Sequence, residues 1–290
     1  PRGTEEDSVL AVTYINREEN AGPPDFYSMP PGVQAPQQLQ NPDPYQAIFF
    51  NEQSLVVRVT NLRPGEERMS ARIYRPWDLF FYRELAFFLH GDQTMPDRVV
   101  AGSTPPAYAY IRFGVDSANY YEYRRPLLRG WQDLRIIMSE LTAIKQVRDQ
   151  ARINERQEFP VPGDPTAIFA IKGSPILTRV TFFGFGIANP IERFPNELST
   201  SMWANELRLV DPVNTNDWAA VGNMNLKLAD LADVTASISH TNPNFHRLEE
   251  RFGNRNMITQ WNVTVNATME KFLPRELKDT KIPITYTHSE

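Results

Sequence analysis

The side chains that could carry chemistry in this sequence are scarce. The chain has four histidines and no cysteine, which excludes thiolate metal sites and disulfide bonds. His90 with Asp92, and His240 with His246, have the donor atoms for metal ligation or acid–base work. Because histidines this isolated are far more often loop residues, we expect no catalytic residue, no cofactor and no enzyme activity.

Four carboxylates would suit a glycoside-cleaving enzyme, which holds two facing carboxyl groups about 5–10 Å apart. They are Glu84, Asp92, Asp116 and Glu122. No spacing along the chain requires any two of them to face each other, so surface carboxylates are the simpler interpretation. The sequence also lacks a phosphate-binding loop, a dinucleotide fingerprint and a nucleophile elbow.

The turn from Asp116 to Asn119 is a weak candidate for a metal site. The side-chain oxygens of Asp116 and Asn119 are hard ligands of the kind that calcium prefers. The same side chains commonly bond to their own backbone in an Asx turn. We favour the Asx turn.

Aromatic residues follow this turn. Tyr120, Tyr121 and Tyr123 with Trp131 could form a platform on which a sugar ring stacks. Since alternate side chains of a strand point into the core, about half of them should be buried. A carbohydrate-binding jelly-roll module of a secreted protein therefore stands as the second hypothesis, and a glycoside-active enzyme as the third.

Composition limits the possible classes of protein. With 290 residues, 41% of them hydrophobic, the chain can form one large domain or two ordinary ones. Its net charge of −5 argues against nucleic-acid binding, which needs an excess of Lys and Arg. Without a run of eighteen apolar residues we expect no membrane-spanning helix. The chain begins at Pro1 without a signal segment, so we interpret it as a piece of a longer protein.

Short alternating runs predict strands over most of the chain. In the central segment, residues 108–115, 120–123 and 131–138 suggest three strands of an antiparallel meander, with Pro126 ending the second. Residues 166–172 and 176–187 suggest a hairpin around Gly173. Other strands are expected at 9–15, 55–60, 69–75, 85–89 and 202–210.

These elements predict the domain organisation. Residues 1–44 hold a first strand and a proline-rich arm, which either extends freely or packs on the domain surface. Residues 45–212, with many short strands and Pro/Gly turns, predict an all-β jelly-roll sandwich. Residues 139–152 are the best helix candidate, with Ser139 as its cap, and the charged segment 146–157 should be solvated.

Residues 213–290 have a different pattern, in which apolar residues alternate with small uncharged polar residues. Four such segments of about ten residues are typical of transmembrane β-barrel strands with a wet interior, and a second water-soluble sheet is the alternative. The smallest such barrels have about eight strands, so these would be part of a larger barrel. The residues expected to face the membrane are Met224, Leu226, Leu228, Val234, Ala236, Ile238, Trp261, Val263, Val265, Ala267, Met269, Ile282, Ile284 and Tyr286.

Several stretches resemble the SprA/Sov family, the gliding-motility and type IX secretion proteins of Bacteroidetes. One departure is His90-Gly91-Asp92, where the resemblance leads us to expect a His-Ala-Glu-like sequence. The similar stretches follow the family's order across the chain and are 9–14, 51–55, 112–123, 126–127, 131–145, 203–209 and 226–231.

The resemblance implies an internal segment of a very large outer-membrane β-barrel translocon, which passes folded cargo to the bacterial cell surface. Its implied role is structural and partner-binding. The implied partners are the remainder of the same barrel, PorV-like shuttle and Plug-like proteins, secreted cargo and outer-membrane lipid. The arm at 20–44 and the loop at 93–107 are candidates for partner contacts.

Overall fold

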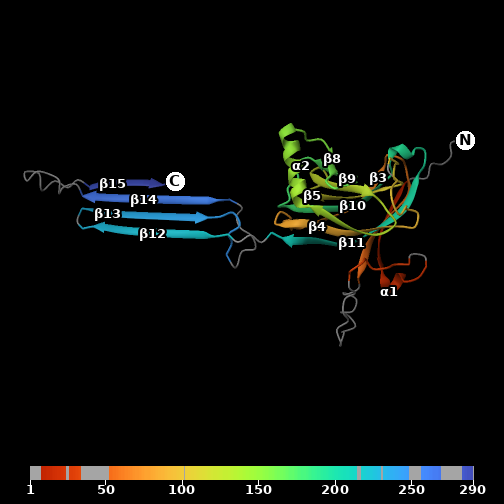
Figure 1. The fold of residues 1–290 in the computed structure, drawn as a ribbon, viewed down its shortest axis with the longest axis horizontal. Coiled ribbons are helices and arrows are strands. Elements are labelled where there is room, and N and C mark those ends of the chain that lie inside the picture. Colours follow the sequence, from red (N-terminus) through yellow and green to blue (C-terminus); the bar gives the residue numbers. More distant parts are fainter. Residues whose placement is uncertain are drawn as a thin grey trace, which may run out of the picture. The chain divides into compact units, whose positions relative to one another are not determined.

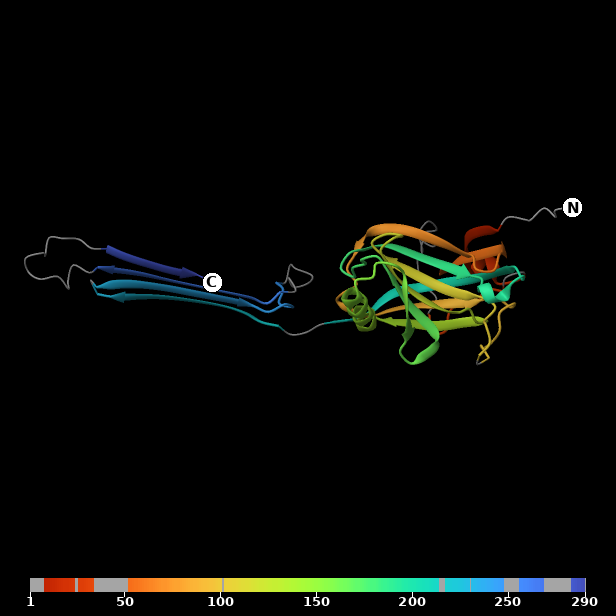
Figure 2. The same ribbon diagram turned by 90° about the horizontal axis from the view of Figure 1, so that it is seen from above.

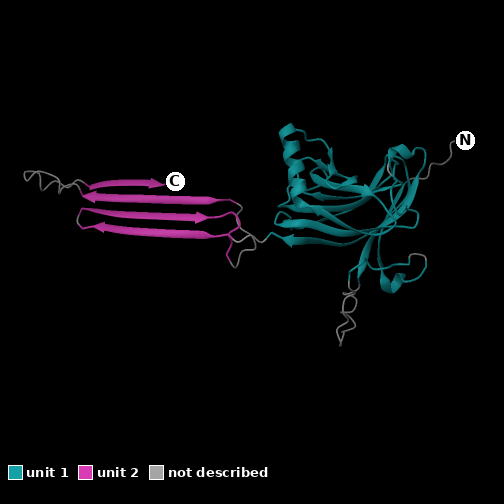
Figure 3. Ribbon diagram, viewed as in Figure 1, with its two compact units in different colours: residues 1–213 teal, residues 214–290 magenta. Residues whose placement is uncertain are grey.

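The computed structural model describes residues 8–23, 26–33, 52–100, 102–213, 217–229, 231–247, 256–268 and 283–289. The chain forms two compact units, residues 1–213 and 214–290 (Figure 3). Strands make up most of both units (Figures 1 and 2), which confirms the all-β prediction.

The described residues of the first unit form strands and two α-helices, α1 (Arg17–Asn20) and α2 (Met138–Ala151), with a 3₁₀ turn η2 (Ile191–Arg193). Its strands are β1 (Val9–Asn16), β2 (Gln53–Leu62), β3 (Glu67–Trp77), β4 (Tyr82–Gly91), β5 (Tyr108–Gly114), β6 (Tyr120–Pro126), β7 (Gly130–Ile137), β8 (Gln157–Val161), β9 (Asp164–Lys172), β10 (Val180–Ala188) and β11 (Leu198–Pro212).

The strand order of the first unit is that of a jelly roll. One sheet has the order β1-β2-β11-β4-β7 and the other β3-β10-β5-β6-β9-β8. Eight of these strands, β2 to β7, β10 and β11, can be numbered one to eight in chain order. The first sheet then has the order one-eight-three-six, and the second sheet has the order two-seven-four-five. This double Greek-key arrangement confirms the predicted jelly-roll sandwich, which β1 extends at one edge and the β8–β9 hairpin at another.

The core lies between the two sheets, because alternate side chains of each strand point inward. Val57, Phe87 and Ile136 of one sheet and Phe113 and Phe169 of the other are fully buried there. Fully burying a side chain of this size stabilises the fold by about 1.5–3 kcal/mol.

The predicted meander over residues 108–138 is wrong in its third strand. β5 and β6 pair as expected, but β7 lies in the opposite sheet and pairs with β4. Pro126 ends the ladder, Leu127 enters the core, and Gly130 has a φ of 73° that favours glycine. These residues carry the chain from one sheet to the other.

The predicted hairpin around Gly173 is also wrong. β9 pairs with β6 and β8, whereas β10 lies between β3 and β5. The connecting residues 173–179 are longer than the 2–5 residues usual in hairpin loops. Buried Leu177 anchors this connection, and its carbonyl accepts the Leu79 N–H at 2.8 Å.

Helix α2 begins one residue earlier than predicted. Its N-cap is Ile137, and no side chain caps it, so the expected Ser139 cap is wrong. Met138 and Leu141 are buried in the core. Arg148, which we expected to be solvated, is buried, because its guanidinium donates to the Gly173 carbonyl and pairs with a neighbouring carboxylate.

The described part of the arm packs on the sandwich. Tyr27 is buried with Val56 and Trp203 in a second small core, and its hydroxyl donates to Glu52 at 2.5 Å. The Trp131 indole N–H donates to the Ser28 carbonyl at 2.8 Å. For residues 26–33, packing on the surface is therefore the correct alternative; residues 34–44 lie outside the described residues.

The second unit is a single antiparallel sheet with the order β12-β13-β14-β15 (Figure 1). Its strands are β12 (Ala219–Leu228), β13 (Ala232–Thr241), β14 (Ile258–Thr268) and β15 (Pro283–Ser289).

In the part of the chain that the structure describes, no helix has the length and apolarity needed to cross a membrane.

Candidate functional site: a sheet with one apolar face

The register of the second unit sorts its side chains onto two faces. Residues directly opposite in antiparallel strands point to the same side of the sheet. Met224 lies opposite Ala236, which lies opposite Val263. The next row on this side joins Leu226, Val234, Val265 and Tyr286. We call this side the apolar face.

Every described residue that the sequence predicts to face the membrane lies on the apolar face. Met269 and Ile282 were also predicted, but they lie outside the described residues. The described residues are Met224, Leu226, Leu228, Val234, Ala236, Ile238, Trp261, Val263, Val265, Ala267, Ile284 and Tyr286.

The opposite side of the sheet, the polar face, carries mainly small uncharged side chains. Asn225 lies opposite Thr235, which lies opposite Thr264. The Thr285 hydroxyl donates to Asn266 at 2.9 Å. Amide and hydroxyl groups lose free energy when buried without hydrogen-bond partners, so this face suits water.

The apolar face is open to its surroundings in the described unit. Met224 is 53% exposed, Ile238 53% and Tyr286 59%. A contiguous apolar surface of this kind marks contact with another protein or a membrane. β12 and β15 each have a neighbour on one side only in the described sheet, so their outer backbone groups are available for pairing.

Three of the four described strands of this sheet are as long as a membrane-crossing strand, whereas β15 has 7 described residues. β12 and β13 have 10 residues and β14 has 11. A tilted strand needs about 9–11 residues to cross the hydrocarbon layer.

The turn at Asp116 is an Asx turn. One Asp116 oxygen accepts the backbone N–H groups of Ala118 and Asn119, both at 2.8 Å, and these hydrogen bonds lower the pKa of Asp116. The Asn119 side chain in turn accepts the Ser174 N–H at 2.8 Å. The described residues contain no group of three His, Asp or Glu side chains placed to hold a metal.

The aromatic platform does not exist. Tyr120, Tyr121 and Tyr123 are all buried, and Trp131 belongs to the other sheet. The carbohydrate-binding hypothesis that depended on these rings is therefore wrong.

The carboxylates proposed for glycoside cleavage have separate partners. Glu84 pairs with Arg135 at 3.0 Å. Asp92 accepts the Ser201 N–H at 2.7 Å. The described structure therefore shows these carboxylates engaged in structural contacts.

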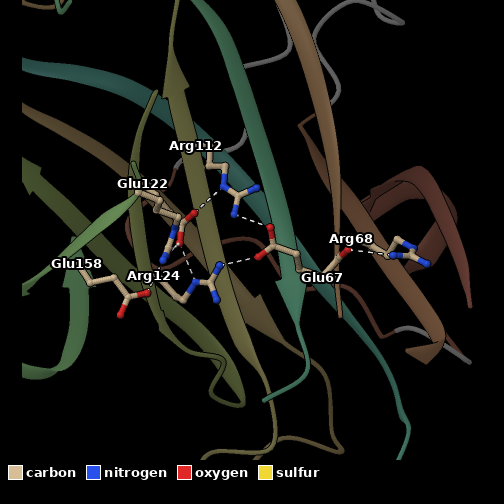
Figure 4. Close-up of polar contacts among 7 residues, drawn as sticks. Glu67, Arg68, Arg112, Glu122, Arg124 and Glu158 are labelled. Atoms are coloured by element: carbon tan, nitrogen blue, oxygen red, sulfur yellow. Dashed lines mark hydrogen bonds and ion pairs between the residues drawn. The ribbon is translucent and has the colours of Figure 1, made fainter. Parts of the chain in front are cut away.

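Glu122 is the centre of an ion cluster that sequence reasoning missed (Figure 4). Its carboxylate is fully buried and contacts Arg112 at 2.5 Å, and Arg124 and Arg156 at 2.8 Å. Glu67 joins Arg112 at 2.5 Å and Arg124 at 2.6 Å, and Glu158 joins Arg156 at 2.5 Å. Three guanidinium groups thus face three carboxylates.

The three arginines of this cluster determine the direction in which the pKa of Glu122 shifts. Burial alone would raise that pKa, but the charges of Arg124, Arg112 and Arg156 outweigh burial and hold it below its ordinary value. Only the pairing of β5 with β6 could have pointed to this cluster from the sequence, because that pairing places Arg112 opposite Glu122.

The histidines do not form a metal site in the described residues. His90 stacks on Trp203 with ring centroids 4.0 Å apart, and burial lowers its pKa to about 4. His240 packs against Trp218 and hydrogen-bonds with Thr259 and Asn242. His246 contacts the carbonyl of Asn244.

The two units define a class of all-β protein in which a jelly roll precedes a sheet with one open apolar face. The chain matches the model of the SprA_N family, described as motility related/secretion protein, over residues 2–130 and 131–290. It therefore belongs to this family, which confirms the resemblance seen in the sequence. A secretion-related family points to an association with the cell envelope. A comparison with curated proteins gave no match.

Proposed function

We propose that residues 219–289 supply wall strands of an outer-membrane β-barrel, the translocation channel of type IX secretion and gliding motility in Bacteroidetes. The jelly roll is then a structural and partner-binding domain of the same channel, and its role is not catalytic. One observation carries this proposal: the register gathers all described membrane-facing candidates on one face of a sheet.

Physical chemistry supports this assignment. Lipid solvates apolar side chains, and the water-filled interior of a barrel solvates small polar ones. A strand edge in lipid would leave backbone groups unpaired at a cost of several kcal/mol each. The outer edges of β12 and β15 are therefore the places where further strands of the same barrel pair.

The partners follow from the same proposal. Outer-membrane lipid contacts the apolar face, and secreted cargo passes the polar face. PorV-like shuttle and Plug-like proteins bind the first unit, with the arm at 20–44 and the loop at 93–107 as contact segments. Deleting residues 34–44 or 98–105 keeps the buried Tyr27, Met95 and Ala107 in the chain and should reduce recovery of these proteins in a pull-down. Unchanged recovery from both deletions would remove the two segments from the proposal.

Adjacent residues of β14 test the wall assignment. Val263 lies on the apolar face and Thr264 on the polar face, and the chain contributes no cysteine of its own. In the intact protein in its native membrane, a cysteine from Thr264→Cys should react with a water-soluble maleimide. One from Val263→Cys should be protected, and a fluorophore there should be quenched by lipid nitroxides. Protection of Val263→Cys without lipid quenching would indicate a protein core and refute the proposal.

A further inference from the structure

Four nitrogen-containing rings form a row across the apolar face. They belong to Trp218, His240, Trp261 and His288, one on or next to each strand of the second unit. The rings of Trp218 and His240 have centroids 4.6 Å apart, as do those of Trp261 and His288. We call these four residues the ring row.

The ring row crosses the sheet diagonally. His240 lies opposite Ala220, two residues along β12 from Trp218. Trp261 lies opposite Ile238, two residues along β13 from His240. His288 lies opposite Val263, two residues along β14 from Trp261. The row thus advances two residues at each strand, the smallest non-zero step that keeps side chains on one face.

The ring row borders polar side chains at His240. On one side His240 hydrogen-bonds with Thr259 at 2.8 Å and with Asn242 at 3.0 Å. On the other side the apolar face continues with Ile238 and Val263 toward the hairpin at 228–232. At His240 the row therefore lies between polar and apolar side chains.

We infer that the ring row is the interfacial girdle of this sheet and lies at the headgroup layer of the bilayer. This inference rests on the proposed wall function. Trp rings favour the membrane interface because they combine an apolar body with a hydrogen-bonding tip, and imidazole has the same combination. Barrel strands are tilted, so a line of equal depth runs diagonally across them, as the ring row does.

The dimensions agree with this placement. From Trp218 to Leu228 the chain advances ten residues, about 34 Å at 3.4 Å per residue. At a tilt of about 35–45° this spans about 24–28 Å of depth, compared with an apolar band of about 25 Å. When the strands tilt in the direction that brings the ring row toward the plane of the membrane, the four rings differ in depth by about 4–8 Å. One interfacial layer is about 5–8 Å thick, so the two values are comparable.

A pair of residues at equal register distinguishes a diagonal interface from one perpendicular to the strands. Met224 and His288 lie in one cross-strand row, at opposite edges of the sheet. A perpendicular interface gives them equal depth. If the ring row follows the interface, Met224 lies about 9 Å deeper, from three strand spacings of about 4.8 Å and a tilt of about 40°.

The experiment measures depth in the intact protein reconstituted in liposomes. Bimane is attached to single cysteines from Met224→Cys and His288→Cys, and its quenching by headgroup and acyl-chain nitroxide lipids is compared. Leu226→Cys and Tyr286→Cys form a second pair at equal register for use if a member of the first pair fails to assemble. Asn223→Cys and Thr287→Cys, on the polar face, are matched controls without lipid quenching.

We expect the acyl-chain nitroxide to quench position 224 most, and the headgroup nitroxide to quench position 288 most. Equal depth at the two positions would overturn the girdle and leave the wall function standing. If lipid quenches neither position, both the girdle and the wall function fail.

Discussion

The substitution Glu122→Gln tests whether the buried ion cluster stabilises the jelly-roll sheet that contains β5 and β6. It removes one negative charge and leaves three guanidinium groups facing two carboxylates. Removing one partner of a buried ion pair costs about 3–5 kcal/mol. Since each 1.4 kcal/mol is a factor of ten, local opening should become roughly 10²- to 4 × 10³-fold more frequent.

Hydrogen exchange measured by mass spectrometry on peptides of β5 and β6 reports this opening in the intact chain. Glu158→Gln is the matched control, because Glu158 pairs only with Arg156 among the described residues and its side chain is 52% exposed. An exposed pair of this kind contributes about 0.2–1 kcal/mol. If Glu122→Gln exchanges no faster than Glu158→Gln, the cluster does not stabilise the sheet and the reasoning is refuted.

The pH dependence of this effect has a definite sign. The pKa of Glu122 is lowered in the folded state, so its stabilisation is complete above the ordinary carboxyl pKa of about 4.3. It is lost as the pH falls through the lowered folded value. The difference between wild type and Glu122→Gln should therefore be constant from pH 8 to 5 and shrink in stronger acid. A difference that grows on acidification would contradict this account.

Three further substitutions probe the first unit. A Cβ in Gly186→Ala would overlap the ring of Tyr110 and should cost about 1–3 kcal/mol of unfolding free energy, measured by denaturant titration against Gly22→Ala, which meets nothing within 4 Å. Burial lowers the pKa of His90 to about 4, so the unfolded state binds more protons than the folded state between about pH 6.5 and 4. The free energy of unfolding should therefore decrease as the pH is lowered through this range, and it should decrease less in His90→Gln. Calcium or a chelator should leave the melting temperature of wild type and Asp116→Ala unchanged, and a calcium-dependent rise would reveal a metal site.

Local patterns predicted most of the strands, although not β8, because alternation of apolar and polar residues depends on only a few neighbours. They could not predict which strands pair. β7 and β10 have ordinary strand patterns, yet β7 lies in the opposite sheet from β5 and β6 and pairs there with β4, and β10 inserts between β3 and β5. Pairing depends on contacts between distant segments, which no local period encodes.

The candidate site divides in the same way. The apolar face was predictable, because four alternating segments that pair in sequence order bring their apolar residues to one side. The ion cluster was not, because Glu67, Arg112 and Arg156 come from three separate strands or loops. The ring row also required the register, since its two-residue step exists only between paired strands.

The two units should differ in their association state in buffer when each is produced separately. Residues 8–213 bury their apolar side chains between two sheets, so this unit should be monomeric and unfold cooperatively. Residues 214–290 present Met224, Leu226 and Ile238 at 44–53% exposure on one face, and an uncovered apolar sheet with open edges favours association. Light scattering should show that residues 214–290 aggregate in buffer and that adding detergent disperses the aggregates. A monomeric, folded 214–290 in plain buffer would mean that its apolar face closes on itself, and it would contradict the lipid-facing assignment.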